Sequence, residues 1–204
     1  METMTIPRRF RGPPNSGNGG YVCGMLARHI TGAAEVALRA PPPLETGLSV
    51  VEVGVGLWEL RQGTATIAIG RAATLEMSRL ERATYAEAVE AEKHTPIKPH
   101  QHPLPMCFVC GPDRAPGDGL RLFAGPLARQ DAGVAFAVPW TPDPSLTATD
   151  GLVAPEFVCP PWIVRRATYA SMTARRGSST PCQSCSVLSP CASKGDHVRA
   201  SDAW

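Results

Sequence analysis

Two pairs of cysteines have the spacing of zinc knuckles. The candidate ligands are Cys107 with Cys110, Cys182 with Cys185, and the nearby Cys191 and His197. Thiolates and imidazoles at such spacing form the tetrahedral sites of structural zinc. Residues 111–181 separate the two pairs, however, and the composition changes within that stretch. We therefore expect no metal site, and a zinc-stabilised binding module is the weakest of three functional interpretations.

A glycine pair could bind an oxyanion. Gly19 and Gly20 begin a segment with helical spacing of apolar residues, and Asn18 is a suitable N-cap. Free amides at a helix N-terminus, together with the helix dipole, polarise a carbonyl or hold a phosphate, and glycine lets a ligand approach the backbone. A tight strand-to-helix turn would require the same residues. We take Asn18, Gly19, Gly20 and Tyr21 as the candidate substrate-binding residues.

No catalytic base is recognisable beside these glycines. Up to Ile30 the helical segment contains only Tyr21, Cys23, Arg28 and His29 as ionisable residues. We expect Cys23 to be a core residue and His29 to interact with the dipole at the helix C-terminus. The sequence therefore leaves the catalytic residues unknown.

Other polar residues are expected to have structural or incidental roles. We interpret Glu156 as a solvated helix cap and Ser16 as a turn residue. His94, His100 and His102 lie among prolines, and we expect a linker there rather than a metal site.

An α+β fold would position these residues. A helix is expected over residues 20–30, and Gly24 in its interior implies close packing against a neighbour. Strands are predicted at 35–40, 48–55, 57–61 and 64–74, with a short strand at 9–11. One helix followed by an antiparallel meander is typical of a sheet wrapped around a helix. A second helix at 78–93 and strands at 120–124 and 133–139 follow.

Charge and composition divide the chain near residue 158. Residues 1–158 contain 14 Lys and Arg against 16 Asp and Glu, whereas residues 159–204 contain 6 against 2. Serine and cysteine are also enriched in this tail, and its few aliphatic residues follow no regular period. We expect the tail to be disordered, since it cannot offset the entropy of its own ordering. Its weak positive charge does not favour nucleic-acid binding.

Several long strings resemble those of actinobacterial thioesterase-like proteins of the hotdog superfamily. They run from Arg9 to Gly24, Cys107 to Arg114, Pro116 to Arg121 and Pro139 to Asp143. The resemblance covers residues 8–158 and implies a double hotdog, in which each of two sheets wraps around a helix. It also implies acyl-thioester ligands such as acyl-CoA. The expected domains are a complete first hotdog at 1–93, a linker at 94–105 and the beginning of a second hotdog at 106–158.

After Val158 the sequence departs from this pattern. The family continues into a helix resembling Trp-Ala-Ala-Leu-Asp-Cys-Pro-Thr-Gly, whereas Pro160 and Pro161 prevent a helix here. The codons that can encode residues 161–167 permit the family's string Leu-Asp-Cys-Pro-Thr-Gly when they are read in a frame shifted by two bases. We hypothesise that a frameshift near codon 159 replaced the rest of the second hotdog with an out-of-frame tail.

Two main functional classes follow. The chain is either a protein that binds or hydrolyses an acyl thioester, or a catalytically defective product with a truncated second hotdog. We expect a cytoplasmic protein without cofactor, stable disulfide or membrane segment, since no apolar run approaches the roughly 20 residues that span a bilayer. A lone hotdog leaves an unpaired sheet edge, so a homodimer through the first hotdog is also expected.

Overall fold

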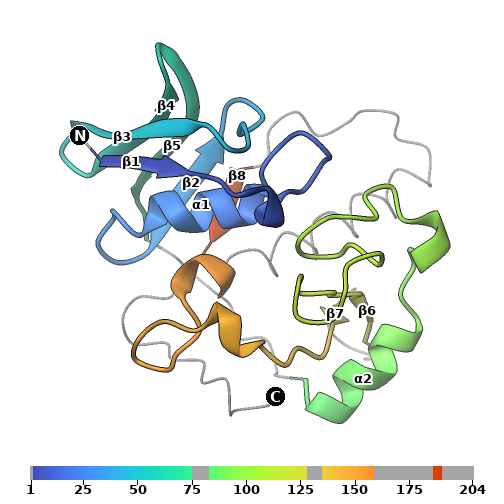
Figure 1. The fold of residues 1–204 in the computed structure, drawn as a ribbon. Coiled ribbons are helices and arrows are strands. Elements are labelled where there is room, and N and C mark those ends of the chain that lie inside the picture. Colours follow the sequence, from blue (N-terminus) through green and yellow to red (C-terminus); the bar gives the residue numbers. More distant parts are fainter. Residues whose placement is uncertain (1, 75–82, 128–134, 159–185, 190–204) are drawn as a thin grey trace, which may run out of the picture.

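The computed structural model describes residues 2–74, 83–127, 135–158 and 186–189. Its largest element is an antiparallel sheet with strand order β1-β3-β4-β5-β2-β8, against which helix α1 lies (Figure 1). The elements are β1 (Glu2–Thr5), α1 (Gly19–Ala27), β2 (Ala34–Leu38), β3 (Gly47–Gly54), β4 (Leu57–Gln62), β5 (Ala65–Ala72) and β8 (Ser186–Ser189). The predicted α+β class is confirmed.

Burial of one helix against the sheet produces the core. Apolar residues of α1 and of the central strands are almost fully removed from solvent; they include Val22, Cys23, Leu26, Val36, Leu48, Leu60 and Ile67. On β3, Leu48 and Val50 are buried while their neighbours are more exposed, as the two-residue period of a strand requires. The four strands expected over residues 35–74 all form, with bounds that differ by at most two residues from those predicted.

The strand predicted at residues 9–11 is wrong. Residues Arg8–Phe10 form a short 3-10 helix (η1), in which the amides of Phe10 and Arg11 donate to the carbonyls of Pro7 and Arg8. These amides are therefore not available for a strand ladder. The first strand is instead β1, which pairs with β3.

The described residues between 83 and 158 contain little regular structure. Helix α2 (Tyr85–Lys93) begins with a capping box between Thr84 and Glu87 and packs on the two-stranded sheet β6 (Gly125–Pro126) and β7 (Phe136–Ala137). Two further 3-10 helices are Pro99–Gln101 and Pro144–Leu146. The predicted helix at 78–93 is confirmed from Tyr85 onward; residues 78–82 lie outside the described part.

The two strands predicted in this part are largely wrong. The amides of Leu120 and Leu122 donate to the carbonyls of Phe108 and Val109, both at 2.8 Å, so this segment pairs with a turn and not with a strand. Of residues 133–139, only Phe136–Ala137 form a strand within the described residues.

Most of the expected tail lies outside the described residues, and so do the hypothesised frameshift and Cys182, Cys185, Cys191 and His197. Its described piece is β8, which pairs antiparallel with β2 at the edge of the sheet. None of the helices in the described residues combines the length and apolar character needed to cross a membrane.

Candidate functional site

The N-terminus of α1 is capped as the sequence predicts. The side chain of Asn18 accepts a hydrogen bond of 3.1 Å from the backbone amide of Tyr21, and the backbone amide of Asn18 donates to the carbonyl of Phe10 at 2.7 Å. Asn18 is extended and only 6% exposed. The cap is therefore a fixed, buried structure.

Two amides remain at this helix start. The first amides of an α-helix have no partner within the helix. Those of Asn18 and Tyr21 are satisfied as just described, whereas the amides of Gly19 and Gly20 have no acceptor among the described residues. Gly20 is buried and Gly19 half-buried. Two adjacent donors at the positive end of a helix dipole can bind a carbonyl oxygen or an anion.

An aromatic cluster lies next to these amides. The Tyr21 ring is stacked on Phe10 with 4.2 Å between ring centroids, and Phe108 and Phe157 complete the cluster. Burial, followed by the negative charge of Glu156, raises the pKa of Tyr21 to about 12, while Arg28 opposes the shift. The Tyr21 hydroxyl is therefore protonated at neutral pH and can donate a hydrogen bond.

Glu156 is not the solvated cap that the sequence predicted. It is 8% exposed, and one carboxylate oxygen lies 3.3 Å from the guanidinium of Arg28. The other, Oε2, is buried and has no hydrogen-bond partner among the described residues. Residues 155–158 are helical and cross α1 where it lacks a side chain: a Cβ on Gly24 would lie 2.7 Å from Cα of Glu156.

This crossing explains the glycine inside α1. Gly20, Gly24 and Arg28 are four residues apart and therefore share one face of the helix. The expectation of close packing at Gly24 is confirmed, although the neighbour is the backbone of a second helical segment.

The first cysteine pair lies beside the same cap. Nδ2 of Asn18 is 3.7 Å from Sγ of Cys107. Hydrogen bonding from the Cys110 thiol is the main cause that lowers the pKa of Cys107 to about 6; burial opposes the shift. The interaction with the Cys107 side chain, burial, and the negative charge of Cys107 raise the pKa of Cys110. Of the two thiols, Cys107 is therefore the one that ionises more readily.

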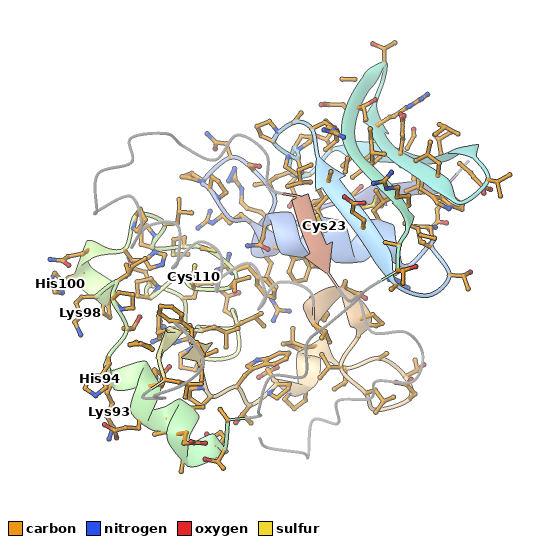
Figure 2. All side chains as sticks on the ribbon, turned by 180° about the vertical axis from the view of Figure 1, so that it is seen from behind. Cys23, Lys93, His94, Lys98, His100 and Cys110 are labelled. Carbon is orange, nitrogen blue, oxygen red and sulfur yellow. The ribbon has the colours of Figure 1, made fainter. Side chains whose placement is uncertain are left out.

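Other predicted residues are placed as expected or away from the cap. Cys23 is fully buried, and Ser16 is buried in the turn before α1. The ring of His29 is tilted against Trp58, with Nδ1 3.7 Å from a carboxylate oxygen of Glu2. His94 and His100 lie at or after the end of α2 with Lys93 and Lys98 (Figure 2). Within the described residues, no three His, Cys, Asp or Glu side chains are grouped as metal ligands.

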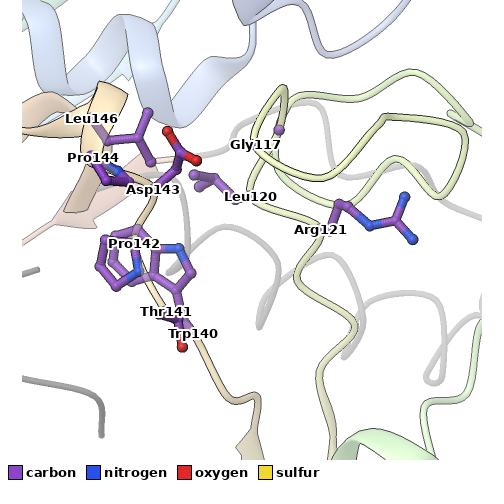
Figure 3. A pocket seen from close by; sticks show the side chains of 10 residues that line it. Gly117, Leu120, Arg121, Trp140, Thr141, Pro142, Asp143, Pro144 and Leu146 are labelled. Carbon is purple, nitrogen blue, oxygen red and sulfur yellow. The ribbon is translucent and has the colours of Figure 1, made fainter. Parts of the chain in front are cut away.

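A hollow that the sequence did not predict lies in the second half of the chain. It has a volume of about 300 Å³ and is lined by Leu120, Trp140 and Asp143 among others (Figure 3). The Asp143 carboxylate accepts from the amide of Ser145 at 2.9 Å, which lowers its pKa. The Arg121 side chain points away from the hollow, and its guanidinium donates to the carbonyls of Pro112 and Arg114. Asp143 and Arg121, two of the polar residues that line the hollow, are thus engaged within the protein.

The structure brings together Asn18, Gly19, Gly20 and Tyr21, and adds three residues that sequence reasoning did not place there: Cys107, Glu156 and Phe157. These three residues are far from α1 in sequence, so local sequence patterns did not indicate that they lie beside it. No protein-family model, curated protein or solved structure matches this chain.

Proposed function

We propose that this chain is a hotdog-type protein that binds an acyl thioester, such as an acyl-CoA, at the N-terminus of α1. The observation that carries the proposal is the pair of amides on Gly19 and Gly20, which have no acceptor among the described residues. The antiparallel sheet with one helix packed on it, and the resemblance of residues 8–158, support the same conclusion.

The two amides would bind the thioester carbonyl oxygen. Neither residue has a side chain, so the oxygen can approach to hydrogen-bond distance. The helix dipole adds partial positive charge at that point. The adjoining rings of Phe10 and Tyr21 provide an apolar environment, in which hydrogen bonds to a polarised carbonyl are stronger than in water.

The site supports binding more directly than hydrolysis. Hydrolysis needs a base that deprotonates water. The carboxylate found against α1 is Glu156, which is paired with Arg28. A catalytically defective protein that retains the ligand site remains the alternative.

The test removes one amide without removing the helix. Proline is favoured at the first helical position, and Asn18 already has the extended conformation that precedes proline, with ψ at 126°. Gly19→Pro therefore deletes the donor, while Gly19→Ala adds a Cβ and keeps it. The ligand is an acyl-CoA analogue in which methylene replaces sulfur, which retains the carbonyl and cannot be hydrolysed.

We expect Gly19→Pro to weaken binding of this analogue about tenfold in calorimetric titration, as loss of one hydrogen bond requires. Gly19→Ala keeps the donor, so its added Cβ should weaken binding less than the proline does. An S-alkyl-CoA thioether, which lacks the acyl carbonyl, should bind both variants equally. Equal weakening of the carbonyl ligand and the thioether would contradict the proposal. Turnover of the parent acyl-CoA, followed by chromatography, then separates a thioesterase from a binding protein.

A further inference from the structure

The Cys107–Cys110 segment is wound more tightly than an ordinary surface turn. The amide of Gly111 donates to the carbonyl of Cys107 at 2.8 Å, and that of Asp113 to the carbonyl of Pro105 at 3.0 Å. A Cβ on Gly111 would lie 2.5 Å from both the nitrogen and the oxygen of Cys107. This turn holds the two cysteines in a fixed relation, three residues apart.

The two cysteines are free thiols and differ in exposure. The side chain of Cys110 is the largest cause of the lowered pKa of Cys107. Cys107 is 4% exposed, whereas Cys110 is half-buried. A Cys-x-x-Cys pair with one sulfur stabilised as thiolate is the arrangement that reacts with oxidants in dithiol redox sites.

Metal binding is the competing use of such a pair. A structural zinc site needs four ligands, and in the described residues no third His, Cys, Asp or Glu is grouped with these two. The hydrogen-bond donors around Cys107 are those that stabilise an anionic sulfur without a metal: the amides of Val109 and Cys110 and the Asn18 side chain.

We propose that Cys107 and Cys110 form a redox-active dithiol that hydrogen peroxide converts to an intramolecular disulfide. This inference goes beyond acyl-thioester binding and does not depend on it. Cys107 is the residue that peroxide attacks, because its thiolate is the stronger nucleophile and peroxide is small enough to reach a nearly buried sulfur. Cys110 is the resolving residue.

The reaction has two balanced steps. The Cys107 thiolate attacks one peroxide oxygen, the O–O bond breaks, and Cys107 becomes a sulfenic acid while hydroxide leaves. The Cys110 sulfur then attacks the sulfenic sulfur, forming the S–S bond and releasing the second oxygen as water. In sum, two thiols are oxidised and one peroxide is reduced to two waters.

The disulfide would alter the cap of α1. Nδ2 of Asn18 lies 3.7 Å from Cys107 Sγ, and a disulfide sulfur carries no negative charge to accept this contact. Oxidation would therefore loosen the residue that caps α1.

Peptide mapping of the full-length chain tests the proposal. Trypsin releases residues 94–114, which contain Cys107 and Cys110 and no other cysteine, and residues 12–28, which contain only Cys23. After limited peroxide treatment and alkylation, we expect the first peptide to be lighter by two hydrogen atoms than its reduced form and unalkylated. The Cys23 peptide should remain a fully alkylated thiol, and dithiothreitol should restore the first peptide.

Two variants assign the roles. In Cys110→Ser the sulfenic acid cannot be resolved, so dimedone should label Cys107; in Cys107→Ser the label should be absent from Cys110. A first peptide that stays dithiol while other cysteines oxidise would overturn the proposal. So would stoichiometric zinc in the purified chain that Cys107→Ser releases. None of these readouts involves a thioester, so they succeed or fail independently of the proposed function.

Discussion

Residues 2–74 and residues 83–158 are held together by different interactions. In the first region, backbone amides and carbonyls of neighbouring strands pair along continuous ladders from β1 to β2. In the second region, the ladder within the described residues is limited to the two-residue strands β6 and β7. Buried apolar residues such as Phe108 and Leu122 add support there, and so do arginine side chains that donate to backbone carbonyls.

Arg114 and Arg121 show how the second region is organised. The Arg114 side chain is almost fully buried, donates to the carbonyl of Met106 at 2.9 Å, and lies 2.9 Å from a carboxylate oxygen of Asp118. Arg121 donates to two further carbonyls of the same turns. Each guanidinium thus satisfies carbonyls that a sheet would satisfy with amides. Irregular chain can be fixed firmly when a rigid multiple donor is placed among its carbonyls.

The largest expected effect comes from removing one such donor. Arg114→Met should lower the free energy of unfolding by about 3 kcal/mol, because buried acceptors lose a charged partner. Arg71→Met is the matched control in the first region, since Arg71 is mostly exposed in its pair with Glu35; its loss should be below about 1 kcal/mol. Urea unfolding measures both. Equal losses would show that the two regions do not differ as described.

The contact between the regions should weaken at high pH. The pKa of Tyr21 is raised from 10.0 to about 12, so the folded state holds the proton more tightly than the unfolded state. Its contribution is complete below pH 10 and is lost as the pH rises towards 12. The loss should reach about 2 kcal/mol by roughly pH 11.5.

Tyr21→Phe isolates this contribution, because phenylalanine has no titrating hydroxyl. Urea unfolding of both proteins between about pH 9 and 11.5 should show that the original chain loses stability relative to Tyr21→Phe as the pH rises. Parallel curves would mean that Tyr21 is not protonated more tightly in the folded protein.

A methyl group added at Gly24 of α1 should destabilise the contact between the two regions. Gly24→Ala places a Cβ 2.7 Å from the backbone of Glu156, and overpacking of this kind costs about 1–3 kcal/mol. Alanine gains about 1 kcal/mol of helix propensity, so we expect a net loss of about 2 kcal/mol or less. Gly54→Ala is the control, since its nearest contact would be 3.8 Å. A stabilised Gly24→Ala variant would show that residues 155–158 do not press on α1.

The smallest difference is expected between the two helix caps. Asn18→Ala removes a buried cap and should cost about 1.5 kcal/mol, whereas Thr84→Ala removes an exposed one from α2 and should cost about 0.5 kcal/mol. Thermal unfolding followed by circular dichroism gives the ranking. The reverse order would mean that α2 contributes more to folding than α1.

The two regions also differ in how well the sequence predicts them. Alternation and helical spacing identified the strands of residues 34–72, α1 and the Asn18 cap, because each is set by neighbours in sequence. The same reasoning failed at residues 120–124, where the extended chain pairs with the Phe108–Val109 turn.

The sequence likewise predicted only part of the candidate site. Gly19 and Gly20 were recognised because a helix start has a local pattern. Glu156 was not, since its burial depends on contact with Gly24 and Arg28, more than a hundred residues earlier. Cys107 was noticed for the spacing to Cys110, but its position beside Asn18 is a property of the folded chain.

Gly111 limits the mutations that the Cys107–Cys110 turn can accept. Its absent side chain leaves room for the nitrogen and oxygen of Cys107, and every amino acid that a single base change can put there carries a Cβ. No single-base missense change in the codon for Gly111 therefore preserves the close packing of this turn. In a library of all substitutions selected for folded protein, position 111 would be depleted of replacements, while the exposed hairpin residue Gly54 would accept many.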